Sequence, residues 1–256
     1  MSRVNILWTG GWDSTYRVLR LMDKNVSIQP YYLKDNRKSE ELELKAIETI
    51  SRDIRNHPNS KCEVLELITM NVSDVPINAE ITKAYKNILK TDFYGSQYDW
   101  LARFAEKVKN LELNIHQDDK AVLIIQKYGD IIREYDDLKG DYYVLDYKKS
   151  SEDLIKVFGN FHFPILTESK LEMKEWAINS GLIDIMNKTW FCFNPINNEP
   201  CGRCNPCTYA IEEGMEYRFS KSAMNRYKLN KFIKPIKKSF FFRGAKKMYK
   251  IILRSK

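Results

Sequence analysis

The N-terminal part of the chain joins a short apolar segment to a glycine-rich turn followed by hydroxyl-bearing residues. The segment reads Leu7-Trp8-Thr9-Gly10-Gly11-Trp12-Asp13-Ser14-Thr15. Two adjacent glycines allow a sharp turn and a close approach of the backbone to a ligand, and the amides that begin a following helix form an anion site. Apolar residues 4–8 predict a strand, and residues 14–24 predict a helix. The pattern therefore predicts a strand, a phosphate-binding loop and a helix.

The glycine spacing differs from two common nucleotide loops. It matches neither the GxGxxG dinucleotide loop nor the GxxxxGK[ST] loop, although both would use the same backbone amides. An ordinary tight turn between a strand and a helix, with no ligand, is the alternative interpretation.

The rest of the chain alternates between apolar runs and amphipathic stretches. The predicted strands lie at residues 26–33, 64–68, 111–116 and 161–166, and the predicted helices at 38–55, 79–89, 97–110, 121–127 and 169–181. This alternation is typical of a Rossmann-like, doubly wound α/β fold with a mostly parallel sheet. We expect three parts: the sheet domain at 1–187, a cysteine-rich segment at 188–215 and a tail at 216–256.

Composition excludes several classes of protein. The 256 residues are 43% hydrophobic, which is enough for a sizeable core and untypical of a disordered chain. The mean hydropathy is -0.50, and no apolar stretch approaches the roughly 18 to 20 residues that span a bilayer. The N-terminus lacks a secretory apolar run, so we expect a cytoplasmic protein.

The positive charge is concentrated in the tail. Residues 216–256 contain 14 Lys and Arg and one acidic residue, whereas residues 1–215 contain 28 basic and 33 acidic residues. Within the tail, one helical stripe carries Phe241, Ala245, Met248 and Ile252. Such a helix could contact an anionic membrane surface, nucleic-acid phosphates or a partner protein, or pack on the sheet domain. A second copy of the chain is a further candidate partner.

Four of the five cysteines lie close together in the sequence, at Cys192, Cys201, Cys204 and Cys207. Four thiolates complete a tetrahedral Zn²⁺ site and leave no position open for catalysis, so the predicted zinc is structural. An iron–sulfur cluster and a pair of disulfides are the alternatives. The isolated Cys62 is expected to pack as a small apolar residue, with a persulfide carrier as the alternative.

The glycine-rich segment resembles the SGGxDS signature of the PP-loop ATP pyrophosphatases, with Thr9 in place of the first serine. This resemblance implies cleavage of ATP between its α and β phosphates, with Asp13 helping to hold Mg²⁺ and the phosphates. The implied nucleotide contacts are Thr9, Gly10, Gly11, Asp13, Ser14 and Thr15.

The two motifs together resemble the 7-cyano-7-deazaguanine synthase family. The matching residues are Thr189-Trp190-x-Cys192 and Pro200-Cys201-Gly202-x-Cys204-x-x-Cys207, together with Pro164, Lys170, Glu172, Gly181 and residues 37–46. The resemblance implies an ATP-dependent ligase that forms a C–N bond. It would adenylate the carboxylate of a 7-deazaguanine, as in queuosine biosynthesis, for reaction with ammonia or another amine. Catalytic roles are implied for Asp13, Ser14 and Lys170.

The middle of the chain departs from that family. Gly95-Ser96-Gln97-Tyr98-Asp99-Trp100 stands in place of its Arg-Asn element, and its Tyr-Pro-Asp segment has no counterpart. We therefore expect Gln97, Tyr98 and Trp100 to shape a different acceptor pocket, with packing of a helix start as the alternative. Two other functions stay open: a PP-loop enzyme that modifies tRNA by thiolation or lysidine-type ligation, and a non-catalytic nucleotide-binding partner protein.

The remaining titratable candidates have no spacing that indicates a site. We expect His57, His116 and His162 to be surface or packing residues. The acidic pairs Asp118-Asp119 and Asp136-Asp137 are expected on solvated turns.

Overall fold

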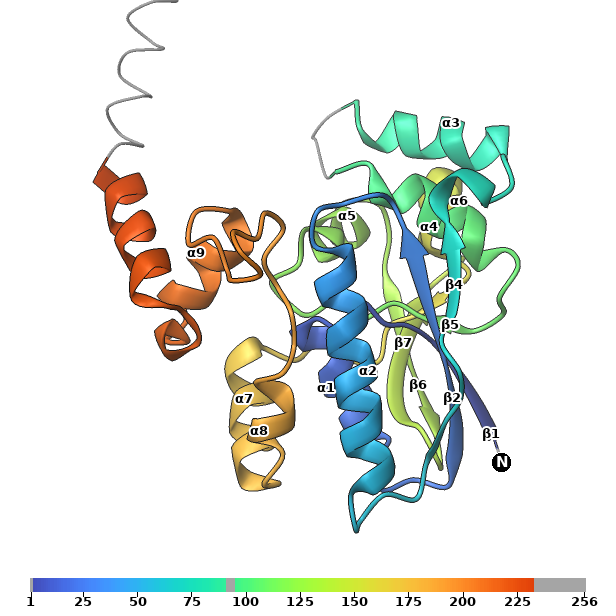
Figure 1. The fold of residues 1–256 in the computed structure, drawn as a ribbon. Coiled ribbons are helices and arrows are strands. Elements are labelled where there is room, and N and C mark those ends of the chain that lie inside the picture. The colour runs from blue at the N-terminus through green and yellow to red at the C-terminus, as the bar shows by residue number, and fades with distance from the viewer. Residues whose placement is uncertain (1, 91–94, 233–256) are drawn as a thin grey trace, which may run out of the picture. The chain divides into compact units, whose positions relative to one another are not determined.

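The computed structural model describes residues 2–90 and 95–232 (Figure 1). The chain divides into two compact units, Met1–Trp190 and Phe191–Lys256. The apolar stripe expected at residues 241–252 lies outside the described residues. Within the described ranges, every helix falls short of the length and apolar character that crossing a bilayer requires.

The first unit is built around a parallel sheet. Its strands are β1 (Ser2–Leu7), β2 (Val26–Lys34), β3 (Glu63–Val64), β4 (Ile68–Asn71), β5 (Leu111–Glu112) and β8 (Phe161–His162). Their order is β3-β2-β1-β5-β8, with β4 also paired to β2, and all these pairs are parallel. The prediction of an α/β fold with a mostly parallel central sheet is confirmed.

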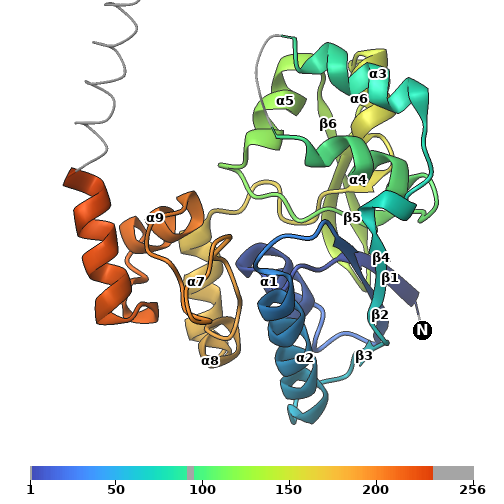
Figure 2. The same ribbon diagram turned by 45° about the horizontal axis from the view of Figure 1, so that its top comes forward.

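Helices connect the strands and follow the last of them. They are α1 (Trp12–Arg20), α2 (Glu40–Asn56), α3 (Ala79–Ile88), α4 (Gln97–Ala105), α5 (Lys120–Tyr128), α6 (Glu152–Phe158), α7 (Lys170–Asn179) and α8 (Ile183–Met186). Helices α3, α4 and α6 pack together (Figure 2). The N-cap predicted at Ser169 is confirmed: its hydroxyl accepts from the Glu172 amide, and the Glu172 carboxylate accepts from the Ser169 amide.

The core explains why β1 and β2 are central. Trp8, Tyr32 and Phe161 belong to a group of large side chains that are less than 2% exposed. A strand with one solvated face would alternate buried and exposed residues, yet β2 is buried at seven of its nine positions. Burial on both faces is typical of an interior parallel strand.

The structure contains a hairpin that the sequence analysis does not predict. Strands β6 (Ile131–Asp136) and β7 (Gly140–Leu145) pair antiparallel around a tight turn. Their polar residues hide the strand pattern, because much of the hairpin surface is exposed. Tyr143 joins the hairpin to Phe163, just after β8, through two backbone hydrogen bonds of 3.1 and 2.9 Å. The Asp136-Asp137 pair lies at this turn, where the Asp136 carboxylate accepts two backbone amides.

Candidate functional site

The glycine-rich loop lies where the strand order reverses direction. Strand β1 pairs with β2, the next strand of the chain, on one side and with β5 on the other. In open α/β sheets, ligands bind beyond the carboxyl ends of the strands at such a switch point. The segments that leave this edge are the loop after β1, at residues 8–11, and the segment after β5, at residues 113–119.

The two glycines have different structural roles. Gly10 has a φ of +67°, and a Cβ atom placed there would lie 2.7 Å from the Glu43 carbonyl oxygen of α2. No residue with a side chain fits this position without displacing the helix. The Gly10 carbonyl accepts a 2.8 Å hydrogen bond from the Trp190 amide. Gly11 is the N-cap of α1, so the first-turn amides of α1 face the loop with no side-chain cap from this residue.

The loop hydroxyls are not equivalent. Thr9 is exposed, whereas Ser14 is buried and its Oγ lies 3.5 Å from the Gly11 carbonyl. Thr15 is fully buried: its Oγ1 accepts a 2.9 Å hydrogen bond from the Trp8 indole, and its amide donates to the Gly11 carbonyl. Thr15 therefore maintains the shape of the loop, and Thr9 is the hydroxyl that can reach a ligand.

Asp13 lies at the same edge in an environment that disfavours its charge. The side chain is 26% exposed, yet its Oδ1 is buried with no hydrogen-bond partner among the described residues. Burial raises the pKa of Asp13, while electrostatic interactions with Lys170 and His116 oppose that rise. The His116 Nδ1 lies 3.7 Å from the Asp13 Oδ2. Residues from α1, α7 and the segment after β5 are thus brought together.

His116 is the residue that sequence reasoning missed. Its side chain is 12% exposed, which agrees with the expected packing role, but it packs beside Asp13, and its buried Nδ1 has no hydrogen-bond partner among the described residues. Its place at the carboxyl end of the strand predicted at residues 111–116 was the available signal. The neighbouring acids differ: Asp118 is exposed, whereas Asp119 caps α5 by accepting from the Ala121 amide at 2.9 Å.

A buried polar network supports the helix on which Gly10 packs. The Tyr32 hydroxyl and the Ser39 hydroxyl donate to the two carboxylate oxygens of Glu43, at 2.7 and 2.6 Å. Burial and the adjacent Glu43 carboxylate raise the pKa of Tyr32. Arg37 lies 3.7 Å from Glu43 and donates to Asp35 at 2.6 Å. These contacts fix the start of α2 beside the loop.

The three residues expected to form the acceptor pocket occupy different environments. Gln97 is exposed and Trp100 is half-buried at the start of α4. Tyr98 is 3% exposed, and its ring lies 5.2 Å from that of Phe158 in the core. Its hydroxyl donates to the Asp119 carboxylate at 3.3 Å. Tyr98 therefore packs as a core residue, and of the three only Gln97 and Trp100 keep exposed surface.

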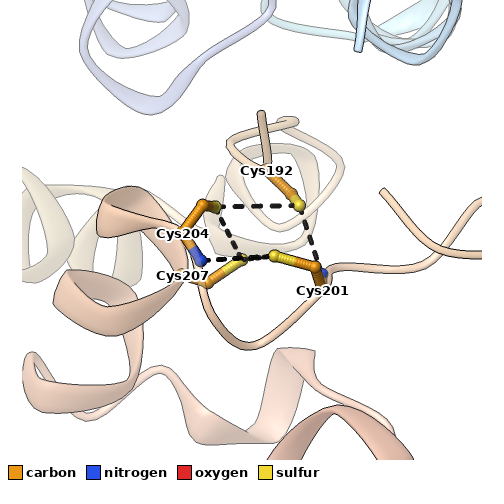
Figure 3. A group of neighbouring side chains, drawn as sticks. All are labelled: Cys192, Cys201, Cys204 and Cys207. Carbon is orange, nitrogen blue, oxygen red and sulfur yellow. Dashed lines mark hydrogen bonds between the residues drawn. The ribbon is translucent and has the colours of Figure 1, made fainter. Parts of the chain in front are cut away.

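The four clustered cysteines form the candidate metal centre of the second unit (Figure 3). Their sulfur atoms all lie within 4.8 Å of one another. Measured pairs are 3.4 Å for Cys204 to Cys207, 3.8 Å for Cys201 to Cys207 and 3.9 Å for Cys192 to Cys204. A tetrahedron with Zn–S bonds of about 2.3 Å has edges of about 3.8 Å. The cysteines are free, so the disulfide alternative does not describe this arrangement.

Local backbone geometry directs the sulfurs inward. Gly202 has a φ of +71°, and a Cβ there would lie 2.2 Å from the Ala223 carbonyl oxygen. The turn that this glycine permits aims the amides of Arg203 and Cys204 at the Cys201 sulfur, each at 3.3 Å. Cys204 is the N-cap of α9 (Asn205–Glu212), which places its sulfur at the helix N-terminus. Amide donors and the helix dipole both favour thiolate over thiol.

The pKa values of the clustered thiols favour the binding of a cation. Hydrogen bonding with Cys192 and Cys207 lowers the pKa of Cys204, and the hydrogen bond with Cys204 raises the pKa of Cys192 to about 12. One cysteine therefore loses its proton easily, and the negative charge of that thiolate opposes deprotonation of the next cysteine. A divalent ion removes this resistance because it displaces the remaining protons. The donor set thus fits the zinc that the sequence predicts.

Cys62 lies outside this cluster. Burial raises the pKa of its thiol, whereas a reactive sulfur carrier has a thiol with a lowered pKa.

Neither protein-family models nor curated proteins match this chain.

Proposed function

We propose that the chain is an ATP-dependent ligase of the PP-loop type, which cleaves ATP to AMP and pyrophosphate while it adenylates a carboxylate. The observation that carries this proposal is the convergence of Asp13, His116 and Lys170 on a glycine-rich loop at the sheet's switch point. A tight turn without a ligand would not need a carboxylate oxygen buried without a partner.

The loop and its neighbours supply different groups for phosphate binding. Backbone amides at the start of α1 suit the phosphates, and the exposed Thr9 adds a hydroxyl donor. Lys170 supplies positive charge against the charge that develops on the departing pyrophosphate, and the His116 imidazole lies beside Asp13. The unpartnered Asp13 oxygen fits a Mg²⁺ ligand, since this ion prefers one or two carboxylates together with substrate phosphates. The ion, when bound, would neutralise part of the phosphate charge.

The resemblance to the 7-cyano-7-deazaguanine synthase family suggests a 7-deazaguanine carboxylate as the acceptor. Its carboxylate oxygen would attack the α-phosphorus of ATP as pyrophosphate leaves. Ammonia would then attack the acyl carbon, with loss of AMP and a proton, to give the amide. A second ATP could adenylate the amide oxygen with release of pyrophosphate, and loss of AMP and protons would leave the nitrile. The burial of Tyr98 leaves Gln97 and Trp100 to read a related base.

We assign the cysteine cluster a structural Zn²⁺, because all four ligand positions are protein thiolates. The metal would hold Cys192 to Cys207 in place and would take no part in the adenylation. Iron from an iron–sulfur cluster, found by elemental analysis of freshly purified protein, would contradict this assignment.

Product analysis tests the proposed reaction. The protein is incubated with Mg-ATP, ammonium and 7-carboxy-7-deazaguanine, and the nucleotides are separated by ion exchange. AMP and pyrophosphate are expected, with Asp13→Ala reducing AMP formation at least about 100-fold. The control Asp118→Ala removes an exposed acid from the turn after β5 and should keep full activity. ADP and orthophosphate as the only products would contradict the proposal.

The product formed from 7-carboxy-7-deazaguanine tests the altered acceptor pocket separately. Adenylation of 7-carboxy-7-deazaguanine without release of nitrile supports a diverged acceptor. Efficient turnover to free nitrile would overturn the divergence and leave the ATP chemistry intact. If labelled ATP gives labelled AMP only when tRNA is added, the result would favour the tRNA-modifying alternative.

A further inference from the structure

Three buried polar atoms at the carboxyl edge of the first unit's sheet have no hydrogen-bond partner among the described residues. They are the Oδ1 atoms of Asp13 and Asn114 and the Nδ1 atom of His116. Asn114 lies at the end of β1, because its Nδ2 donates to the Leu7 carbonyl at 3.5 Å. Burying a polar atom without a partner costs free energy, so these atoms indicate a bound group that is not part of the chain.

The spacing of Asp13 and His116 distinguishes between the groups that could lie there. The His116 Nδ1 is 3.7 Å from the Asp13 Oδ2, whereas a direct hydrogen bond would bring the two atoms to roughly 2.7 to 3.2 Å. A water with hydrogen bonds of about 2.8 Å holds its two partners about 4.5 Å apart at the tetrahedral angle. A metal ion with bonds of about 2.1 Å holds two ligand atoms about 3.6 Å apart at an angle of about 120°. The observed spacing therefore fits a shared ion best.

Backbone contacts hold the segments that carry the two side chains. The Gln117 amide donates to the Glu168 carbonyl at 3.1 Å, and the Asp119 amide donates to the His116 carbonyl at 2.9 Å. Asp13 lies in the first turn of α1. The two segments meet at one edge because β5 pairs in parallel with β1. Since the backbone is already fixed, little conformational freedom is lost when a ligand binds.

The two donor atoms favour some divalent ions over others. Mg²⁺ is usually bound through oxygen atoms, from carboxylates, phosphates and water. An imidazole nitrogen favours first-row transition ions, and Mn²⁺ is the one of these that also suits carboxylate and water ligands. Lys170 on α7 acts electrostatically on Asp13 and would oppose a bare cation. An anionic ligand such as phosphate would offset that repulsion.

We propose that Asp13 and His116 together bind one divalent ion, through a carboxylate oxygen and the Nδ1 nitrogen, and that His116 makes the site prefer Mn²⁺ to Mg²⁺. The inference deepens the proposed function, because it concerns the ion assigned there to Asp13. The role of the ion with ATP rests on that function, whereas the binding of the ion needs no turnover.

Electron paramagnetic resonance tests the site with Mn²⁺ alone as the probe. The full chain is first loaded with Zn²⁺, so that the cysteine cluster is occupied, and no nucleotide is added. The signal of free Mn²⁺ is lost when the ion binds to protein. One bound Mn²⁺ per chain is expected, with Mg²⁺ displacing it only when present in excess. No bound Mn²⁺, or equal competition by Mg²⁺, would overturn the proposal.

Two substitutions at position 116 separate a metal ligand from a packing residue. His116→Ala should weaken Mn²⁺ binding at least about tenfold, since one of the two protein donors is lost. His116→Asp replaces the nitrogen by a carboxylate oxygen, so it should keep an ion bound but lose the preference for Mn²⁺ over Mg²⁺. A packing residue would not change this preference.

The control His57→Ala alters a histidine whose Nδ1 accepts from the Asn59 amide, and it should leave both measurements unchanged. The Tm of each variant shows that it is folded, and unchanged Mn²⁺ binding in folded His116→Ala would refute the assignment. Product analysis keeps the two proposals apart. Mn²⁺ binding at this site by a chain that forms no AMP would contradict the proposed function and support the site. AMP formation with Mg²⁺ by a chain that binds no Mn²⁺ would do the reverse.

Discussion

At the scale of single residues, Asp13 combines a functional position with an energetic cost. Its pKa is raised above 3.8 by burial, so the folded state holds the proton more tightly than the unfolded state. For an acid shifted in this direction, stability falls as the pH rises from about 3.8 through the folded pKa, and the loss then stays constant. The ionised carboxylate therefore destabilises the fold at neutral pH.

Asp13→Asn should raise the Tm at pH 7 while abolishing AMP formation. The neutral amide has the same shape and removes the buried charge, and the gain should shrink as the pH approaches 4. Thermal melts at both pH values measure the effect. Asp118→Asn, on an exposed turn, should leave the Tm unchanged, and a lower Tm for Asp13→Asn at pH 7 would contradict the interpretation.

The buried pair of Arg17 and Glu112 joins α1 to β5. Their side chains are 6% and 4% exposed, with bidentate hydrogen bonds of 2.8 and 2.7 Å. Arg17→Met would leave a buried carboxylate unpaired and should cost about 3 to 5 kcal/mol of unfolding free energy. Urea denaturation should show much of that loss recovered when Glu112→Leu is added. Arg133→Met, in an exposed pair with Asp141, should cost less than about 1 kcal/mol.

At the scale of elements, the contact between the loop and α2 depends on Gly10. Gly10→Ala combines a positive φ with a clash against the Glu43 carbonyl, so it should destabilise the first unit and reduce ATP turnover together. Gly140→Ala is the matched control: its φ is +77°, but nothing lies within 4 Å of the added Cβ. That control should show only the left-handed strain of about 1 to 2 kcal/mol. Equal Tm losses for the two variants would mean that the clash contributes nothing.

Elements with local signals could be predicted from the sequence, and those that depend on distant partners could not. The strand before Gly10, the cap at Ser169 and the cysteine cluster are each encoded within a few residues. The β6–β7 hairpin is exposed and polar, and its attachment near β8 involves a residue some twenty positions later. His116 approaches Asp13 only because β5 pairs with β1, which no short pattern reveals.

At the scale of the whole molecule, the two units should differ in what stabilises them. The first has a large apolar core, whereas the buried residues described in the second are few and include three of the four clustered cysteines. A strong chelator should therefore unfold the second unit at a temperature where the first stays folded, giving two thermal transitions in place of one. Limited proteolysis should then cut after Trp190. Cys204→Ala should behave like the chelated protein, and Cys62→Ala should not. A single unchanged transition after complete zinc removal would refute a structural role for the metal.

The hydrogen bond between the Trp190 amide and the Gly10 carbonyl has a consequence for the order in which the protein is made. Its two partners are 180 positions apart, and ribosomes add about 5 to 20 residues per second. The glycine loop is therefore synthesised roughly 10 to 40 seconds before its last backbone partner. A nascent chain that ends before Trp190 has the loop sequence without this closure. On the proposed function, nucleotide binding would therefore begin only after Trp190 has been synthesised and has closed the loop.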